Sequence, residues 1–302
     1  MGNDDLRWMS AAELATAIAR RKVSPVDAVR AVLDAIEKTQ TLNAWVTVDA
    51  DAALAAARAA ERAVMRRGAR LGPLHGVPFG VKDLVITKGV RTTFGTPIYR
   101  DNVPTEDAPS VERLKSAGAI MIGKTNTPTF GWIGATHNLV FGPTRNPWHP
   151  DRTPGGSSGG ASAAVAAGLG ALHVGTDGGG SIRKPSAFTG TFGLKPSYGR
   201  VPIYPASGAW SVSHVGPMTR TVKDAALMLN VIAGPDERDP YSLPAHRVDY
   251  VKALKGSVKG TSADGSVRGG ASSATGSVAT STSSSGAWVV SATATALACC
   301  GS

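Results

Sequence analysis

Two glycine-rich loops that also carry hydroxyl side chains offer the clearest chemistry in this sequence. The first loop spans residues 153–160 and contains Ser157 and Ser158, and the second spans residues 175–181 and ends at Ser181. Glycine lets a backbone approach a ligand closely, and successive amides in such a loop can converge on an oxyanion. We therefore expect the loops to hold a serine nucleophile and a second serine that activates it.

A serine nucleophile needs a base, and Lys82 is the candidate. It follows the apolar run of residues 77–81, where burial would lower the lysine pKa and favour the neutral amine. A lysine at the end of a strand more often extends its ammonium into solvent. The assignment of Lys82 as a base therefore depends on its occurrence together with both serine loops.

Residues 155–159 also fit the nucleophile-elbow pattern G-x-S-x-G, which requires a strand before the serine and a later aspartate and histidine. The preceding residues 146–154 contain three prolines, which a central strand does not accommodate. The histidines that follow are His173, His214 and His246, and nothing in their sequence context singles one out. A serine–histidine triad is the weaker alternative.

A second pattern, the phosphate loop G-x-x-x-x-G-K-[ST], matches residues 118–125. The middle residues of a phosphate loop wrap phosphate with free amides, whereas here they are Ala-Ile-Met-Ile, which is typical of a buried strand. The Asn126-Thr127-Pro128 sequence that follows opposes the helix that the motif requires. The sequence therefore disfavours nucleotide binding at this segment.

The elements that must position these residues alternate between strands and helices, which predicts an α/β sheet with helices on its faces. We expect strands at residues 77–83, 119–122 and 171–174, and helices at residues 109–116 and 221–233. The first of these strands carries Lys82, and the third leads into the second serine loop.

The two ends of the chain have a different character. Capping signals at Ser10 and at Ser24-Pro25, and an alanine-rich stretch at roughly residues 50–67, predict three helices. We expect residues 1–70 to form a helical segment that packs on a core of residues 71–255. Residues 256–302 are dominated by Ser, Thr, Gly and Ala, so they cannot bury enough apolar surface to offset the entropy of ordering. We expect them to form a low-complexity, disordered tail.

Composition narrows the class of protein. Of the 302 residues, 42% are hydrophobic, and the formal net charge of +10 comes from scattered basic residues, which favours a solvated surface over a nucleic-acid interface. No apolar run reaches the roughly 18 residues of a membrane span, and the polar start lacks a signal-peptide core. The only cysteines, Cys299 and Cys300, build no disulfide framework or metal cluster. We expect a cytoplasmic protein without nucleic-acid or membrane partners, with a homodimer left open.

The chain from about residue 71 to residue 243 resembles the amidase signature family of serine hydrolases. Six motifs carry the resemblance in family order and at family-like spacing, although each alone is weak. They are residues 76–83, 123–128, 145–148, 154–160, 175–183 and 193–200. The resemblance implies a mixed β-sheet covered by helices on both faces. It also implies hydrolysis of a small-molecule carboxylic amide through an acyl-enzyme, without a metal or cofactor.

The family triad falls on Ser181 as nucleophile, Ser157 as proton relay and Lys82 as general base. In the family, the relay serine follows a cis peptide bond. The resemblance places the oxyanion hole at the amides of Gly178, Gly179, Gly180 and Ser181. Asp177 and Arg183 are expected to brace this loop, and Ser158 is the rival to Ser157 as the relay.

Residues 127–132 and 214–220 resemble the stand-alone amidases of the family, although an acidic residue is usual where this chain has Thr129. A glutamine amidotransferase-type subunit that needs partners remains an alternative. Family-like sequence ends near residue 260, which suggests a truncated or frameshifted chain that lacks the C-terminal part of the fold. A catalytically impaired remnant is therefore the other alternative.

Overall fold

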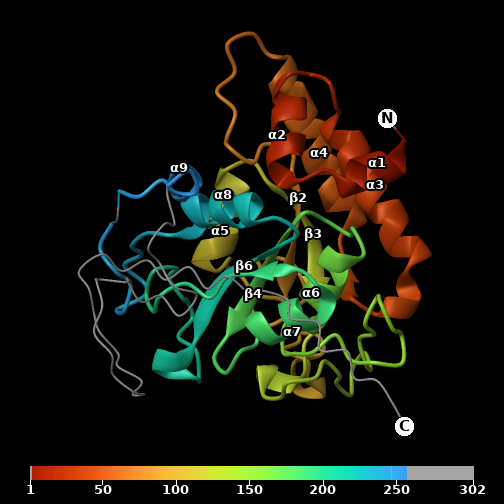
Figure 1. Ribbon diagram of the computed structural model, residues 1–302, viewed down its shortest axis with the longest axis vertical. Helices are drawn as coiled ribbons and strands as arrows, with labels where there is room; N and C mark the ends of the chain where they lie inside the picture. Colours follow the sequence, from red (N-terminus) through yellow and green to blue (C-terminus); the bar gives the residue numbers. More distant parts are fainter. Residues whose placement is uncertain (1, 246, 257–302) are drawn as a thin grey trace, which may run out of the picture.

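The computed structural model of the protein describes residues 2–245 and 247–256 (Figure 1). The segment expected to form a disordered tail therefore lies almost entirely outside the described residues. The helices of the described residues are α1 (Asn3–Trp8), α2 (Ala11–Ala19), α3 (Pro25–Lys38), α4 (Ala50–Met65), α5 (Pro109–Ser116), α6 (Gly159–Ala166), α7 (Arg183–Thr189), α8 (Val222–Ile232) and α9 (Tyr250–Ala253).

The described strands form one mixed sheet of six strands in the order β1-β3-β2-β4-β6-β5. Their bounds are β1 (Trp45–Val48), β2 (Pro78–Lys82), β3 (Ile120–Thr125), β4 (Leu172–Asp177), β5 (Phe192–Gly193) and β6 (His214–Thr219). The central strand β2 is parallel to both β3 and β4, whereas β1, β6 and β5 add antiparallel pairs at the two sides. This arrangement confirms the predicted mixed α/β fold.

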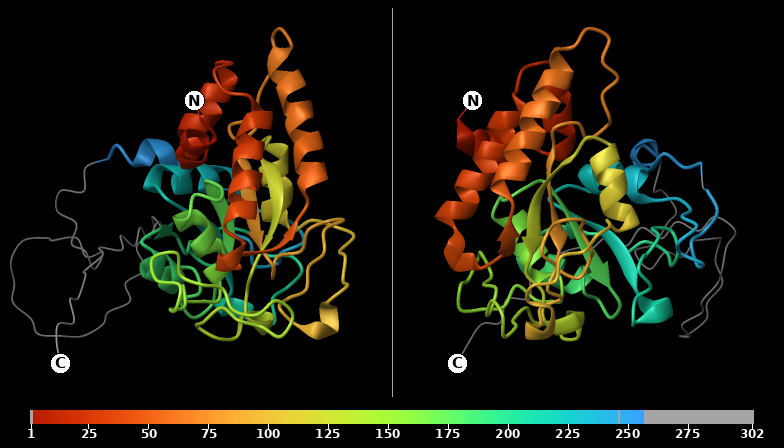
Figure 2. Two further views of the ribbon diagram at one scale, coloured as in Figure 1. Left: turned by 90° about the vertical axis from the view of Figure 1, so that its right-hand side faces the viewer. Right: turned by 180° about the vertical axis from the view of Figure 1, so that it is seen from behind.

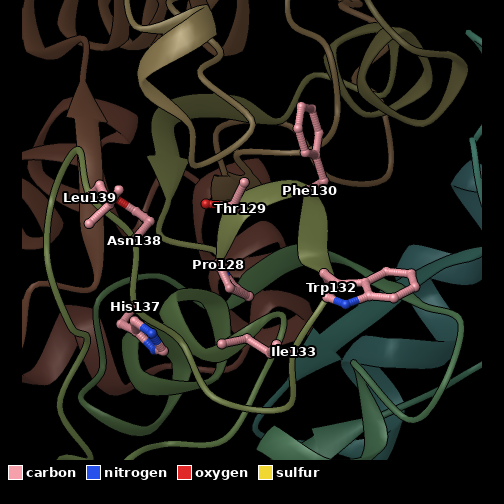
Figure 3. Close-up of a pocket in the computed structure, with 8 residues that line it drawn as sticks. All are labelled: Pro128, Thr129, Phe130, Trp132, Ile133, His137, Asn138 and Leu139. Carbon is pink, nitrogen blue, oxygen red and sulfur yellow. The ribbon is translucent and has the colours of Figure 1, made fainter.

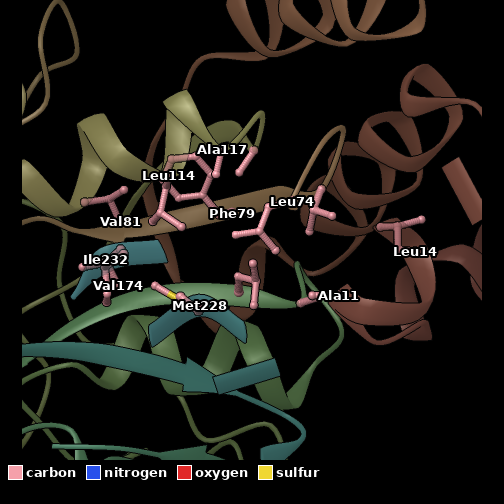
Figure 4. Close-up of a cluster of buried hydrophobic side chains, with 14 of the residues drawn as sticks. Ala11, Leu14, Leu74, Phe79, Val81, Leu114, Ala117, Val174, Met228 and Ile232 are labelled. Atoms are coloured by element: carbon pink, nitrogen blue, oxygen red, sulfur yellow. The ribbon is translucent and has the colours of Figure 1, made fainter. Parts of the chain in front are cut away.

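Strand β2 is buried along its whole length, which explains its almost continuous apolar sequence. Phe79 and Val81 point into the largest hydrophobic cluster, together with side chains of α5 and α8 (Figure 4). Because parallel strands end at the same edge of a sheet, the carboxyl ends of β2 and β4 bring Lys82 and Asp177 to one edge.

Helices cover both faces of the sheet, as the views in Figure 2 show. In β6, Val215 belongs to the cluster that contains the apolar residues of α8, whereas Met218 packs with Ala161 and Val165 of α6. The side chains of Val215 and Met218 point to opposite faces, because successive side chains alternate along a strand. Helices α8 and α6 therefore lie on opposite faces.

The N-terminal helices begin at the predicted caps. Ser10 accepts a hydrogen bond from the Glu13 amide and completes a capping box, and Ser24 caps α3 with Pro25 at its first position. The expectation that residues 1–70 are helical is wrong in one element, because Trp45–Val48 forms β1 and pairs with β3. The N-terminal segment therefore contributes an edge strand as well as helices.

Two of the predicted strands are longer in the structure than expected, and the sequence did not predict β1, β5 or β6. Strands β3 and β4 continue to Thr125 and Asp177, beyond the apolar runs that indicated them, because polar side chains at the sheet edge still join the ladder. The sequence did not indicate β6, because Gly216 and Pro217 interrupt it and both residues are poor strand formers. Among the described residues, no helix is long and apolar enough to cross a membrane.

Candidate active site

The edge where β2 and β4 end holds the predicted base. The Lys82 Nζ atom lies 2.6 Å from the Ser157 hydroxyl oxygen and 2.8 Å from the Thr176 hydroxyl oxygen. The side chains of Lys82 and Ser157 are almost completely shielded from solvent, with exposed fractions of 0% and 1%. Burial lowers the pKa of Lys82 well below its usual value, and the charge of Asp177 opposes this only in part. The lysine is therefore suited to accept a proton near neutral pH.

The first serine loop is held tightly against its surroundings. The Gly156–Ser157 peptide bond is cis. The Thr136 hydroxyl donates to the Gly155 carbonyl at 2.9 Å and accepts from the Gly159 amide at 3.1 Å. A Cβ on Gly156 would lie 2.8 Å from the backbone of Ala135, so glycine is required there by space. These contacts fix the direction of the Ser157 side chain.

Ser158, the rival relay, is engaged elsewhere. Its hydroxyl donates to the Thr176 carbonyl at 3.1 Å and accepts from the Thr176 amide at 3.3 Å. Its own amide donates to the Ser181 carbonyl at 3.1 Å. Ser158 therefore joins the first serine loop to β4 and to the second loop, while Ser157 faces Lys82.

Asp177 organises the second serine loop. Its carboxylate accepts hydrogen bonds from the amides of Gly180, Ile182 and Arg183, and the Arg183 guanidinium donates to both of its oxygens at 3.0 Å. Burial opposes ionisation of this carboxyl, but the donors outweigh it and lower the Asp177 pKa to about 2. The bracing contact expected between Asp177 and Arg183 is thus present in the structure.

The amides expected to form the oxyanion hole are not equivalent. The Gly180 amide donates to Asp177 at 2.8 Å, which differs from the prediction that it is an open donor. Gly178 and Gly179 are exposed, and a Cβ on Gly179 would have no atom within 4 Å. Within the described part of the chain, the amides of Gly178, Gly179 and Ser181 and the Ser181 hydroxyl make no hydrogen bond. These groups are free to contact a substrate.

The histidines do not complete a triad in the described residues. His173 is buried against Trp45, hydrogen-bonds to the Leu169 carbonyl, and has its pKa lowered by burial to about 3. The Nδ1 atom of His214 lies 3.0 Å from the Asp177 carbonyl oxygen, and no hydrogen bond joins this ring to a serine. His246 lies outside the described residues.

The phosphate-loop match is part of the sheet, because Ile120–Thr125 forms β3. Lys124, which would bind phosphate in such a motif, is buried and donates from Nζ to the Val85 carbonyl and, at 3.0 Å each, to the hydroxyls of Thr87 and Thr92. These contacts hold the segment that follows β2. No group of residues suited to hold a metal ion occurs among the described residues.

Two residues near Lys82 and Ser157 have no role in the sequence-based prediction. Thr176 contacts Lys82 although it lies 94 residues away. Gly131 has a φ of 69°, and a Cβ there would lie 2.5 Å from Leu84 Cδ1 and 3.1 Å from the Ser157 hydroxyl oxygen, so a larger residue would crowd both side chains. The pairing of β2 with β4 brings Thr176 to Lys82. A prediction of that strand pairing would have identified Thr176 as a contact of the lysine.

An apolar pocket of about 450 Å³ lies along residues 128–139 (Figure 3), a segment whose Gly131 lies beside the Ser157 hydroxyl. It is lined by Pro128, Thr129, Phe130, Trp132, Ile133, His137, Asn138 and Leu139. Trp132 is 89% exposed, so the pocket opens at the surface of the described structure.

Comparisons with known proteins agree on one family. A family model described as Amidase matches residues 27–268. An acylamidase of Rhodococcus erythropolis is 46% identical over 262 residues, which cover 86% of this chain and 55% of the relative. A component of the glutamyl-tRNA(Gln) amidotransferase of Moorella thermoacetica is 47% identical over 258 residues, which cover 85% of this chain and 53% of the relative.

The solved structure of a bacterial aryl acylamidase, described as one of the amidase signature enzymes, has a TM-score of 0.77 and 41% sequence identity. The match covers 82% of this chain and 52% of that chain. The chain spans about half the length of the curated relatives it matches.

Proposed function

The chain belongs to the amidase signature family, and we propose that it hydrolyses a carboxylic amide through an acyl-enzyme formed on Ser181. The observation that carries this proposal is the 2.6 Å contact between the Nζ atom of fully buried Lys82 and the Ser157 hydroxyl. A neutral lysine in that position can remove a proton from serine without a histidine.

In the first step, the Ser181 oxygen attacks the amide carbonyl carbon. Its proton passes to the Ser157 oxygen as the Ser157 proton passes to Lys82. The Ser181 hydroxyl makes no hydrogen bond in the described residues, so this step requires it to turn towards Ser157 when substrate binds. Catalytic hydrogen bonds commonly tighten only in the substrate complex. The negative charge on the former carbonyl oxygen is stabilised by the amides of Gly178, Gly179 and Ser181.

In the second step, the C–N bond breaks and Lys82 returns its proton through Ser157 to the leaving nitrogen. The products of this step are ammonia or an amine and an ester of the acyl group on Ser181. Water then attacks the ester carbonyl, and its proton follows the same route. Departure of the Ser181 oxygen, with a proton from Lys82 through Ser157, releases the carboxylic acid and restores the enzyme.

We favour a stand-alone amidase over an amidotransferase-type subunit because residues 127–132 and 214–220 resemble the stand-alone branch. The chain is 46% identical to the acylamidase and 47% identical to the amidotransferase component, so overall similarity does not separate the two. Hydrolysis of simple anilides without any partner would support the first. Glutaminase activity that depends on added partner proteins would support the second.

A fluorophosphonate probe tests the nucleophile in the full chain. We expect the wild type to be labelled and Ser181→Ala to lose the label together with amide hydrolysis. Ser158→Ala is the matched variant, and it should still be labelled because Ser158 is assigned no attack step. Labelling that persists in Ser181→Ala would contradict the assignment. Soluble, folded wild type that is neither labelled nor active would support a catalytically impaired remnant.

A further inference from the structure

Lys184 lies directly beside the proposed nucleophile loop. It is in the first turn of α7, three residues after Ser181, and its amide donates to the Gly180 carbonyl at 2.7 Å. A Cβ on Gly180 would lie 2.9 Å from Lys184 Cε and 3.1 Å from its Cγ. The methylene chain of the lysine therefore packs along the loop at a position where no side chain intervenes.

The ammonium of Lys184 reaches the segment that passes the relay serine. Its Nζ atom lies 3.2 Å from the position that a Cβ on Gly134 would occupy. Three residues earlier, Gly131 abuts the Ser157 hydroxyl. The cation is thus held between the nucleophile loop and residues 131–134, the two parts of the chain that border the reacting groups.

Lys184 has no partner of opposite charge in residues 2–245 and 247–256, where it makes no ion pair and no side-chain hydrogen bond. The carboxylate of this loop belongs to Asp177, and both of its oxygens accept hydrogen bonds from the Arg183 guanidinium. Lys195 adds another cation close to Arg183: burial and the charge of Arg183 lower the pKa of Lys195, and the charge of Asp177 opposes this shift. The one carboxylate of this loop is therefore engaged by Arg183, and it forms no ion pair with Lys184 in the described residues.

An apolar surface adjoins this cation. Ile133 and Trp132, which directly precede Gly134, line the 450 Å³ pocket with Phe130 and Pro128 (Figure 3). The pocket and the Lys184 ammonium both border residues 131–134, so a ligand that contacts both would lie beside this segment. The chemistry that fits both features is an apolar group joined to a single negative charge.

We infer that Lys184 binds a carboxylate on the amide substrate, so that the enzyme selects anionic amides with an apolar part over their neutral counterparts. This inference rests on the proposed amide hydrolysis and names its substrate class. It makes Lys184 a residue that determines specificity and gives it no role in proton transfer.

Two matched pairs of anilides test the inference in the full chain, one with the charge on the acyl side and one with it on the amine side. The first pair is succinyl-4-nitroanilide and pentanoyl-4-nitroanilide, and the second is 4-acetamidobenzoate and 4-acetamidotoluene. We expect the wild type to favour the anionic member of at least one pair in kcat/KM. Lys184→Gln should lower that preference about fivefold, and Lys184→Glu should lower it about twentyfold or more. An unchanged preference for both pairs in Lys184→Glu would overturn the inference.

Lys22→Glu is the matched control, because it makes the same charge change in the turn after α2, at the end of the molecule away from α7 (Figure 1). Lys22→Glu should leave the preference for anionic anilides unchanged. An effect as large as that of Lys184→Glu would show that the net charge of the protein alone sets this preference.

Calorimetric titration of the uncleaved anilides into Ser181→Ala, with and without Lys184→Glu, separates binding from turnover. The inference is supported if Ser181→Ala binds an anionic anilide more tightly than its neutral counterpart and Lys184→Glu abolishes this preference. If the wild type nevertheless hydrolyses none of the four anilides, only the proposed function fails. Binding without preference overturns the inference whatever the activity.

Discussion

Two fully buried lysines lie on neighbouring parallel strands, and their surroundings differ in one respect. Lys124 on β3 donates to three oxygens, one carbonyl and two threonine hydroxyls, which matches the three protons of an ammonium. Lys82 on β2 contacts two hydroxyls, and one of them belongs to a serine in a loop beside the exposed glycines. Burial lowers the pKa of both side chains.

The comparison teaches that burial alone does not make a lysine a base. The partners of Lys124 all belong to the segment that follows β2, so the lysine holds that segment and passes no proton onward. The Thr87 and Thr92 hydroxyls donate to the Val90 carbonyl, whereas in the described residues the Ser157 hydroxyl donates to no other group and can pass a proton on to a third one. The two lysines therefore differ in function because their hydrogen-bond partners differ.

Replacement of Lys82 should have the largest effect on activity. We expect Lys82→Met to lower kcat/KM by roughly 10⁴-fold, since it removes the proposed general base. Thermal unfolding should show a smaller loss of stability than in Lys124→Met, because Lys82→Met leaves two hydroxyls but no buried carbonyl without a donor. Lys124→Met is the matched control. A loss of activity as large as that of Lys82→Met, with folding intact, would remove the distinction between the lysines.

Replacement of Lys124 should act mainly on stability. Lys124→Met leaves the Val85 carbonyl and two threonine hydroxyls buried without their donor, and we expect a loss of about 2 kcal/mol in the free energy of unfolding. Urea denaturation followed by circular dichroism measures this quantity. A variant as stable as the wild type would show that the contacts of Lys124 do not hold the segment.

The pH dependence of stability should carry the signature of Lys124. Burial lowers the pKa of its amine from the usual 10.5 to about 7, with Asp83 opposing the shift. Between these values the unfolded chain holds a proton that the folded chain has released, so the free energy of unfolding rises with pH in that window. The slope can reach about 1.4 kcal/mol per pH unit for one such group. Urea titrations at several pH values should show a smaller slope in Lys124→Met than in the wild type. Equal slopes would contradict the assignment.

Removal of the second partner of Lys82 should have the smallest effect. Thr176→Val keeps the shape of the side chain and deletes one hydroxyl, so we expect kcat/KM to fall about tenfold. Thr136→Val is not a suitable control, because Thr136 holds the first serine loop. Thr16→Val is suitable, since in the described residues the Thr16 hydroxyl bonds to the Ala12 carbonyl of its own helix. Activity of Thr176→Val equal to that of Thr16→Val would show that Ser157 alone positions the lysine.

The sequence could predict what depends on neighbours along the chain. The caps at Ser10 and Ser24 begin helices as expected, and Pro109 begins α5 at the expected residue. The short strand β1 escaped prediction because it is stabilised by pairing with β3 and not by a pattern of its own. Local signals thus located most helices, whereas edge strands depended on partners distant in sequence.

In the candidate site, too, local motifs indicated some residues, whereas other contacts depend on the tertiary fold. Lys82, Ser157 and Ser181 could be proposed from the sequence because each lies in a motif of the resemblance. The role of Thr176 depends on the parallel pairing of β2 with β4, and the use of the Gly180 amide by Asp177 depends on the shape of the loop. Neither can be derived from residue types and spacing alone.

The distance in sequence between Lys82 and its partners has a consequence for folding kinetics. The lysine donates hydrogen bonds to Ser157, which lies 75 positions later in the chain, and to Thr176, which lies 94 positions later. Closing a loop of that length lowers the chain entropy before the new contact stabilises the fold. Folding therefore slows as such long-range contacts become more numerous. We therefore expect the capped N-terminal helices to form early, and the site of Lys82 to assemble only when the central strands have paired.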